Sequence, residues 1–297
     1  MTTHKHKKAT PMMVTVYIIL GIASVCCIAP FLLMLSASFT DELTIISEGY
    51  SFWPKKFSLA AYEYLATNAK YLTRAYGITF LVTLCGTTVN LLITTMLAYA
   101  ISRRDLPGRK VLNFMVVFIM LFNGGLVPTY LVYTEIFHIK NTFFALLVPL
   151  LMMSAFNVML ARSYFQNSVP FSIIEAARID GAGEFLTFWR VVIPLSLPII
   201  ATIGLFVGVA YWNDWYNGMI YLTKPELYSI QNVLNQMLSN IQFLKNNTEG
   251  VSAMSGTIPS SSVRMAIAAV AVVPILIVYP FFQKYFVKGI ALGGVKE

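Results

Sequence analysis

Long apolar runs fill most of the chain, and short polar segments separate them. Six runs without Asp, Glu, Lys or Arg are apolar enough to cross a bilayer: 9–40, 75–102, 111–134, 141–161, 191–213 and 265–283. Each reaches the roughly 17–25 residues that a transmembrane helix needs. The pattern therefore predicts an all-α membrane protein with six transmembrane helices, at about 12–38, 75–101, 111–133, 142–165, 191–213 and 264–286.

These helices define one transmembrane domain, residues 12–286, between the tails 1–11 and 287–297. Loop 166–190 connects the fourth and fifth helices, and the outer segment 214–263 connects the fifth and sixth. The first apolar run is much longer than the roughly 7–15 apolar residues of a signal peptide, so we expect it to remain as an uncleaved anchor.

A seventh charge-free run, 227–244, has a different pattern. It contains eight Ser, Asn and Gln residues, which make it too polar for lipid. Its apolar residues recur at the spacing of one helix face: Leu227, Ile230, Leu234, Met237, Leu238, Ile241 and Leu244. This pattern predicts an amphipathic helix that lies at the membrane interface.

Glycine and proline predict where the apolar helices break. Asn123-Gly124-Gly125 and Pro128 interrupt the third predicted span, because paired glycines weaken a helix and proline lacks a backbone donor. Pro194 and Pro198 stand near the start of the fifth span. Proline is tolerated in a first helical turn, so we expect that helix to begin near residue 194, after a sharp bend.

The distribution of charge predicts the orientation in the membrane. The chain is 57% apolar and 11% charged, with a mean hydropathy of +0.70; an ordinary soluble domain has roughly 25% charged residues. Residues 1–11, 102–110, 162–190 and 284–297 carry 13 Lys and Arg against 5 Asp and Glu, whereas the segments on the opposite side carry 8 of each. The positive-inside rule therefore predicts that both termini are cytoplasmic. The formal net charge of +8 is explained by topology and does not require a nucleic-acid partner.

Several kinds of chemistry lack their residues. No Gly is followed by Lys, so the chain has no GxxxxGK[ST] loop for ATP phosphates. No carboxylate falls within the six apolar runs, which counts against a proton- or sodium-coupled carrier. His4, His6 and His138 have no metal-site spacing, and no catalytic constellation is visible, so we expect neither a metal site nor an enzyme. Cys26, Cys27 and Cys85 fall inside predicted spans, where a thiol packs as a small apolar residue.

One polar segment stands out between the fourth and fifth spans. Residues 175–194 read EAARIDGAGEFLTFWRVVIP, and a segment with Glu, Arg and Asp cannot stay in hydrocarbon. Its pattern is Glu-Ala-Ala, three residues, Gly181, nine residues, then Val191-x-Ile193-Pro194. This resembles the EAA loop of permease subunits of binding-protein-dependent ABC importers. We call residues 175–194 the EAA segment.

The resemblance covers most of the chain. The segments FNGGLVPTYL at 122–131 and IPSSSVRMAIAAVAVVPILIVYPFFQKYFVKGIALGGVKE at 258–297 are similar to MalG-type permeases of carbohydrate importers, in a subgroup that imports oligosaccharides derived from polysaccharides. The resemblance implies the MetI-like permease fold in a bacterial cytoplasmic (inner) membrane. It also implies a second, different permease subunit, two ATPase subunits that bind ATP and Mg²⁺, and an extracytoplasmic sugar-binding protein.

The resemblance also implies roles for particular residues. The EAA loop is the coupling helix that docks into the ATPase; the matching residues are Glu175, Ala176, Ala177, Asp180, Gly181, Ala182 and Gly183. Small residues permit a close approach, Gly181 permits a tight turn, and Asp180 is expected to cap the following helix.

The carboxyl tail of the family reaches the ATPase dimer, and here it matches Gly293, Gly294, Val295 and Lys296. The loop before the last span contacts the binding protein; candidates are Asn246, Asn247, Gly250, Ser252 and Ser255. A frayed tail and a flexible connector are the alternatives.

Candidates for the substrate path come from polar and aromatic residues at membrane depth: Asn90, Thr94, Asn157, Tyr211, Trp212 and Asn213. Aromatic faces beside hydrogen-bonding groups suit a sugar. An interfacial aromatic belt and hydrogen bonds between helices are the alternatives, and Thr95 shares the second of them. The alternative function for the whole chain is a secondary transporter or channel that acts without an ATPase; a membrane scaffold or sensor subunit is a third.

Overall fold

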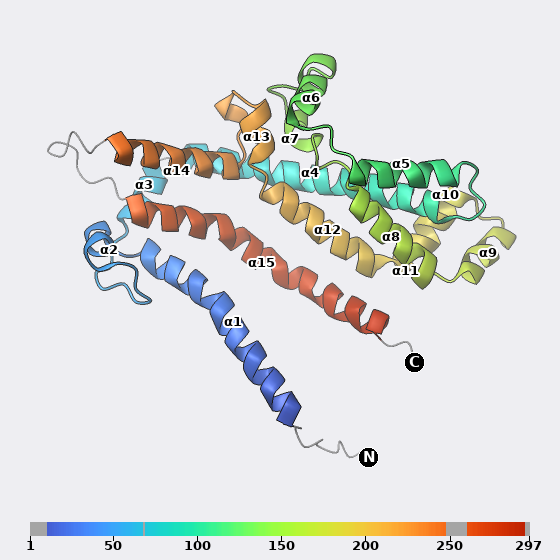
Figure 1. Ribbon diagram of the computed structural model, residues 1–297, viewed down its shortest axis with the longest axis horizontal. Helices are drawn as coiled ribbons and strands as arrows, with labels where there is room; N and C mark the ends of the chain where they lie inside the picture. Colours follow the sequence, from blue (N-terminus) through green and yellow to red (C-terminus); the bar gives the residue numbers. More distant parts are fainter. Residues whose placement is uncertain (1–10, 68, 248–259, 295–297) are drawn as a thin grey trace. The chain divides into compact units, whose positions relative to one another are not determined.

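The computed structural model describes residues 11–67, 69–247 and 260–294, and most of them are helical (Figure 1). These described ranges contain no β-strand; one isolated antiparallel bridge joins Thr40 and Phe57. The prediction of an all-α protein is therefore confirmed.

Fifteen α-helices and three short helices of other types follow one another along the described residues. The first part of the chain holds α1 (Pro11–Ser38), α2 (Glu42–Glu48), α3 (Ala60–Thr67), α4 (Ala69–Ser102), α5 (Arg109–Leu121), α6 (Leu126–Leu131) and the π-helix η1 (Val132–Ile136). The middle holds α7 (Phe144–Leu147), α8 (Ala155–Ser168), α9 (Phe171–Ile179), α10 (Glu184–Thr187), the π-helix η2 (Phe188–Val192) and α11 (Ile193–Leu195). The last part holds α12 (Leu197–Trp212), α13 (Tyr216–Tyr221), the 3-10 helix η3 (Pro225–Leu227), α14 (Ile230–Asn247) and α15 (Ser260–Gly294).

The described residues fall into two compact units: one comprises those within 1–69 and 240–273, and the other comprises those within 70–239 and 274–297. In the first unit, Glu42 of α2 holds the start of α15. Its Oε1 accepts a hydrogen bond from Ser261 N, and its Oε2 accepts from Ser262 N and Oγ, all at 2.8 Å. A carboxylate there satisfies N–H groups that have no partner within the helix. Burial raises the pKa of Glu42, but these hydrogen bonds outweigh it, so the pKa lies below its usual value.

Two described helices, Met12–Ser38 and Ala69–Ser102, are long and apolar enough to cross a membrane. Two further spans are counted if each of two bent helix pairs is taken as one span. These pairs are Arg109–Leu121 with Leu126–Ile136, bent by 116°, and Glu184–Leu195 with Leu197–Trp212, bent by 84°. Length and composition of the described helices thus support two to four spans, and the count of six stays a prediction. Cys26, Cys27 and Cys85 lie on these helices as free, exposed thiols, which differs from the packing that we expected.

The predicted break in the third apolar run is confirmed. Helix α5 ends at Leu121, and α6 begins at Leu126. Between them Gly125 has a φ of +87°, and its N–H donates to Asn123 Oδ1 at 2.9 Å. Pro128 is the third residue of α6, where a backbone N–H has no partner within the helix. Pro128 therefore fits the first turn of α6 without removing a hydrogen bond.

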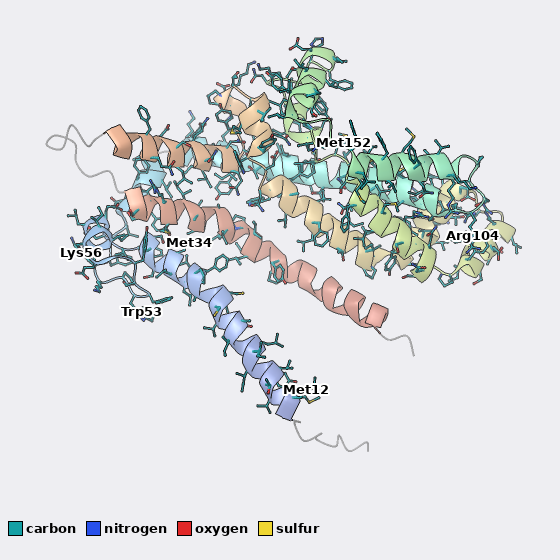
Figure 2. All side chains as sticks on the ribbon, viewed as in Figure 1. Met12, Met34, Trp53, Lys56, Arg104 and Met152 are labelled. Carbon is teal, nitrogen blue, oxygen red and sulfur yellow. The ribbon has the colours of Figure 1, made fainter. Side chains whose placement is uncertain are left out.

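The fourth apolar run differs from its prediction. We expected one helix over 142–165, but only α7 and α8 are helical there, and residues 148–154 separate them. Pro149 lacks a donor for a continuing helix, Leu150 has a φ of +63°, and Ser154 Oγ caps α8 by accepting from Asn157 N at 3.4 Å. We call residues 148–154 the α7–α8 break; Met152, labelled in Figure 2, belongs to it.

Side chains from distant helices satisfy the carbonyl groups around this break. Asn90 Nδ2 of α4 donates to Leu151 O at 2.7 Å, and Tyr211 Oη of α12 donates to Leu147 O at 2.8 Å. Asn217 Nδ2 of α13 donates to Pro149 O at 3.0 Å. Backbone that is not helical is tolerated at membrane depth only where such partners or water exist. These three side chains therefore make the break possible.

Replacing Gly86 with Ala is expected to destabilise this arrangement. A Cβ at Gly86 would lie 2.6 Å from Cε2 of Tyr211, so the ring and its hydrogen bond to Leu147 O must shift. Overpacking of this kind costs about 1–3 kcal/mol. Thermal unfolding of the purified chain in detergent measures the loss. Gly77→Ala on the same helix is the control, because an added Cβ there meets nothing within 4 Å; an equal loss in both variants would contradict the explanation.

The fifth apolar run also begins differently from its prediction. We expected the helix to start near residue 194 after a sharp bend, but the chain is already helical from Glu184 through Leu195. The 84° bend lies at Ser196, and α12 follows it. Pro194 and Pro198 occupy the second positions of α11 and α12, so each proline lies in a first turn. The prediction that the prolines lie in a first helical turn is correct, but they belong to the starts of two helices, α11 and α12, rather than one.

The amphipathic helix expected over 227–244 is confirmed as α14, which begins three residues later, at Ile230. Within the second unit, Ile230, Val233 and Leu234 are buried on one face. The first of them donates its backbone N–H to Thr79 Oγ1 of α4 at 2.8 Å. An apolar stripe and a side-chain acceptor therefore fix the start of this helix against α4.

Candidate functional site

The EAA segment begins on a short exposed helix. Helix α9 carries Glu175 and Ala176 on its exposed surface and Ala177 in a half-buried position. Pro170 is the N-cap residue of this helix and has extended backbone. Ile174 is the buried residue of α9, so a single apolar side chain anchors a helix whose other side chains remain largely accessible. Ala176 and Ala177 thus lie on a short surface helix, whereas Ala182 and Gly183 follow its end.

Gly181 ends α9 in a specific turn. Its φ is +82°, its N–H donates to Arg178 O at 3.0 Å, and Ala182 N donates to Ala177 O at 2.9 Å. This pair of bonds is the Schellman motif, which satisfies the last carbonyl groups of a helix and requires a residue with positive φ. Glycine adopts that conformation without strain. The prediction that Gly181 makes a tight turn is confirmed.

Asp180 has a different role from the one that we predicted. It is the C-cap residue of α9, with its N–H donating to Ala176 O at 3.0 Å. The N-cap of the next helix, α10, is Gly183, and no side chain caps it. The prediction that Asp180 caps the following helix is therefore wrong, because two residues of the Schellman turn, Gly181 and Ala182, separate Asp180 from the N-cap residue Gly183.

A network of charged residues joins the EAA segment to the end of α4. Arg178 Nη2 donates to Asp105 Oδ2 at 2.6 Å, and Arg178 Nε donates to Glu184 Oε1 at 2.9 Å. Arg103 contacts Asp105 with Nε and Nη2, both at 3.2 Å, and its Nη2 lies 3.5 Å from Glu184 Oε1. Tyr99 Oη donates to Glu184 Oε2 at 2.7 Å. We call these five residues the α4–EAA network.

The sequence analysis missed this network. In the sequence, Arg103 and Asp105 only add to the charge of loop 102–110, and Arg178 and Glu184 are polar residues of the EAA segment. The mixed positive and negative charges within each segment were the available signal for ion pairs. Nothing in the local sequence shows that Arg178 meets Asp105, 73 positions away, or that Glu184 meets Tyr99, 85 positions away. Figure 1 shows α9 and α10 at the same end of α4 as the start of α5.

The electrostatics keep the network ionised. Hydrogen bonds from the guanidinium groups of Arg103 and Arg178 hold the pKa of Asp105 well below its usual range. Burial raises the pKa of Glu184, but hydrogen bonds from Tyr99 and Arg178 outweigh it, and its net pKa is lowered. A carboxylate with a lowered folded pKa stabilises the fold above its unfolded pKa of about 4 and loses that contribution as pH falls. The network is therefore fully charged at neutral pH.

Exposed apolar side chains surround the EAA helix. Ile179 is 87% exposed and Phe185 is 68% exposed, and Ile173, Leu186 and Trp189 are also exposed. Phe185 also borders a cavity of about 470 Å³ that Tyr99 and Arg103 line on the α4 side. Exposed apolar side chains gathered around a polar motif are typical of a surface that meets another protein.

Three of the candidate path residues are buried within the chain. Asn90 and Tyr211 donate to the carbonyl groups of the α7–α8 break, and Thr94 Oγ1 donates to Asn90 Oδ1 at 3.1 Å. Each of the three is at most 2% exposed. The bonds of Asn90 and Tyr211 join separate segments, which agrees with the alternative that we stated, whereas the bond of Thr94 lies within α4.

The other three candidates differ in their exposure. Asn157 is buried in the first turn of α8. Asn213, after the end of α12, is exposed, and its Oδ1 accepts from Gln231 Nε2 at 3.3 Å. Trp212 is half-buried, with its ring 6.3 Å from that of Tyr76.

Trp212 lines a cavity that α4 and α12 form for the most part. The cavity has a volume of about 410 Å³, and its lining includes Thr83, Thr87, Gly204 and Gly208. The Oγ1 atoms of Thr83 and Thr87 are buried and have no hydrogen-bond partner among the described residues. A buried hydroxyl without a partner is costly, so neither group is explained by the contacts of the described chain.

The remaining predicted residues lie at or beyond the limits of the described chain. Gly293 and Gly294 are the last residues of α15, whereas Val295 and Lys296 lie outside the described residues. Asn246 and Asn247 end α14, and Gly250, Ser252 and Ser255 lie outside the described residues. Their predicted contacts with the ATPase and the binding protein stay predictions. No group of three or more His, Cys, Asp or Glu suited to a metal ion occurs where the structure describes the chain.

Comparison with known proteins agrees with this arrangement. Residues 91–292 match the family model "Binding-protein-dependent transport system inner membrane component". The chain is 38% identical over 271 residues to the polygalacturonan/rhamnogalacturonan transport system permease protein YtcP of Bacillus subtilis, covering 91% of this chain and 93% of YtcP. It is 35% identical over 297 residues to protein LplC of the same organism, covering 99% and 98%.

A solved structure is also similar. It is a bacterial ABC transporter involved in the import of the acidic polysaccharide alginate, with a TM-score of 0.80 and 29% sequence identity. The match covers 96% of this chain and 100% of that chain, so the permease fold extends over nearly the whole sequence. The family model, the relatives and the shared fold all agree: this chain belongs to the family of binding-protein-dependent transport system inner membrane components.

Proposed function

We propose that the chain is the transmembrane permease subunit of an ATP-driven importer of oligosaccharides derived from polysaccharides. Membership of the permease family supports the transport role. The name of YtcP and the alginate transporter, which both refer to polysaccharides, support the substrate class. The alternative, a secondary transporter or channel without an ATPase, has no comparable support.

The proposed topology has six spans with both termini in the cytoplasm of a bacterial cell. Loop 166–190 and the tails 1–11 and 287–297 face the cytoplasm, and the segment 214–263 faces outward. The Lys and Arg bias of the loops supports this orientation. The bent helix pairs support the view that the third and fifth spans are broken helices rather than straight ones.

The proposed assembly contains a second, different permease, two ATPase subunits and an extracytoplasmic sugar-binding protein. ATP and Mg²⁺ are held by the ATPase subunits, since the sequence lacks a phosphate-binding loop. This chain therefore contributes no catalytic residue. Its part is to bind the ATPase and to change conformation.

The exposed EAA helix is the single observation that carries this proposal. Glu175 and Ala176 lie on the accessible surface of α9, surrounded by exposed apolar side chains such as Ile179 and Phe185. In the proposed mechanism the ATPase holds α9 and moves it when its dimer closes. The α4–EAA network passes this motion to α4, and the helical stretch Glu184–Leu195 passes it through the bend at Ser196 to α12.

The first experiment is purification of the tagged chain in mild detergent with identification of its partners, followed by reconstitution. Recovery of a second permease and an ATPase, with ATP hydrolysis that an oligosaccharide and binding protein stimulate, is the expected result. Charge reversal at Glu175 is expected to lower this stimulation without preventing insertion. Solute flux by the chain alone, without ATP, would replace this proposal with the secondary-transporter alternative.

Thr87→Val tests whether the cavity beside Trp212 belongs to the substrate path. The Thr87 hydroxyl is buried without a partner among the described residues, so its removal should leave thermal stability unchanged or raise it by about 1 kcal/mol. If oligosaccharide hydroxyls use this group, the uptake rate of reconstituted transporter falls while stability does not. Thr88→Val is the control, because Thr88 is exposed and its hydroxyl donates to Leu84 O within α4. Unchanged uptake in Thr87→Val would remove this cavity from the path.

A further inference from the structure

A basic cavity lies beside the α4–EAA network and is separate from the candidate substrate path. It has a volume of about 380 Å³ and lies between loop 102–110, the end of α8 and the start of α9. Its lining includes Arg103, Arg104, Arg109, Gln166 and Asn167. None of the described residues that line it carries a carboxylate. Figure 2 labels Arg104, at the end of the molecule where α9 and α10 lie.

Arg103 has a donor that the α4–EAA network does not use. Its side chain is only 6% exposed; Nε and Nη2 contact the carboxylates of Asp105 and Glu184. The remaining nitrogen, Nη1, is buried and has no hydrogen-bond partner within the described part of the chain. Its guanidinium carbon lies 5.8 Å from the ring centre of Phe171, which also lines the cavity. A buried charged donor without an acceptor is costly, so this site calls for an additional acceptor.

Further positive charge gathers at the same place. Arg109 Nε donates to Ile101 O at 3.0 Å, and Arg162 Nε approaches the same carbonyl oxygen at 3.4 Å. Gln166 Nε2 donates to the next carbonyl, Ser102 O, at 3.1 Å. Two guanidinium groups that share one carbonyl repel each other unless an anion lies nearby. The lining of the cavity does not supply that anion.

We propose that this cavity binds a phosphate group, carried by an anionic phospholipid headgroup or by a soluble phosphate. The planar guanidinium group of arginine donates to phosphate oxygens in a paired geometry, and three arginines line the cavity. The end of α4 is also the end of the second predicted span, which is the depth of lipid headgroups, and basic pockets at this depth suit anionic lipids. The bound phosphate offsets part of the positive charge of the arginines and braces loop 102–110 against the first turn of α9.

The test uses the full-length chain in phosphatidylcholine nanodiscs, with and without phosphatidylglycerol, and measures thermal unfolding. Phosphatidylglycerol is expected to raise the midpoint by about 2–4 °C, the shift for one site at a few times its Kd. Arg104→Gln combined with Arg109→Gln should abolish the rise. Lys110→Gln is the control, because it removes one positive charge from the same loop at an exposed residue outside the cavity lining. The test does not depend on the transported substrate or on the ATPase.

A second arm distinguishes the two sources of phosphate. Titrating inorganic phosphate into the phosphatidylcholine discs gives a saturable rise if the site takes a soluble phosphate, and no rise if it requires a lipid. Either result, lost in the double variant and kept in Lys110→Gln, supports the proposal. If the double variant does not fold, Arg104→Gln alone is compared with the unchanged chain by native mass spectrometry, with fewer bound phosphatidylglycerol molecules expected. No response in either arm, or an equal response in all variants, overturns the proposal.

Discussion

Arg178→Glu is expected to abolish most of the oligosaccharide-stimulated ATP hydrolysis of the assembled transporter, while the chain still inserts and folds. Arg178 contacts two carboxylates from different segments, Asp105 and Glu184, so reversal replaces two ion pairs with three neighbouring negative charges. Arg178 is partly exposed and lies at the surface, so the global fold should survive the change. Energetic coupling between distant sites is typically about 5–150-fold, so we expect stimulation to fall by roughly tenfold or more.

The measurement is ATPase activity of proteoliposomes with and without substrate and binding protein, together with pull-down of the ATPase. Lys110→Glu is the control, since it reverses one charge of an exposed residue in loop 102–110 that lies outside both the α4–EAA network and the basic cavity. Arg178→Lys should keep part of the stimulation, because a lysine retains the charge but not the paired geometry. If ATP hydrolysis is stimulated normally in Arg178→Glu, or is lost as severely in Lys110→Glu, the network does not transmit the motion.

Gly181→Val is expected to prevent productive binding of the ATPase. Gly181 has a φ of +82°, and the Schellman turn that ends α9 depends on that conformation. The left-handed conformation destabilises a residue with a side chain by about 1–2 kcal/mol, and a β-branched residue by more. An added Cβ meets nothing within 4 Å, so the whole effect comes from the backbone. We expect α9 to fray and the copurified ATPase to fall severalfold.

Hydrogen exchange of the α9 amides reports the fraying, and the yield of copurified ATPase reports the functional result. Gly183→Ala is the control two residues away, where φ is −68° and an added Cβ also meets nothing within 4 Å. Gly181→Asn should retain most of the binding, because asparagine tolerates positive φ. Unchanged exchange and ATPase yield in Gly181→Val would show that the turn is not needed for docking.

Local signals in the sequence predicted the features that depend on neighbouring residues. The apolar runs predicted helices, and the periodicity over 227–244 predicted α14. Asn123-Gly124-Gly125 predicted the break that α5 and α6 show, and Gly181 predicted the turn after α9. Each follows from backbone freedom or side-chain period within a few residues, which a sequence displays directly.

The errors share another cause. The α7–α8 break was expected to be helical, because its apolar composition suits a span and its carbonyl partners are remote. Asn90, Tyr211 and Asn217 approach from 61, 64 and 68 residues away, and only the folded chain brings them to the break. Without these three side chains, a continuous helix satisfies the backbone groups in lipid with less free-energy cost, so the sequence pattern predicted a continuous helix.

The candidate site divides in the same way. The sequence by itself determined that the EAA segment is polar, lies between two apolar runs and turns sharply at Gly181, since charge, hydropathy and glycine act locally. Only the tertiary structure decided that Arg178 and Glu184 meet Arg103, Asp105 and Tyr99, that Asp180 ends α9 rather than starting α10, and that the bend lies at Ser196. Ion pairs between segments and the directions of consecutive helices depend on long-range packing, which no short stretch of the chain encodes.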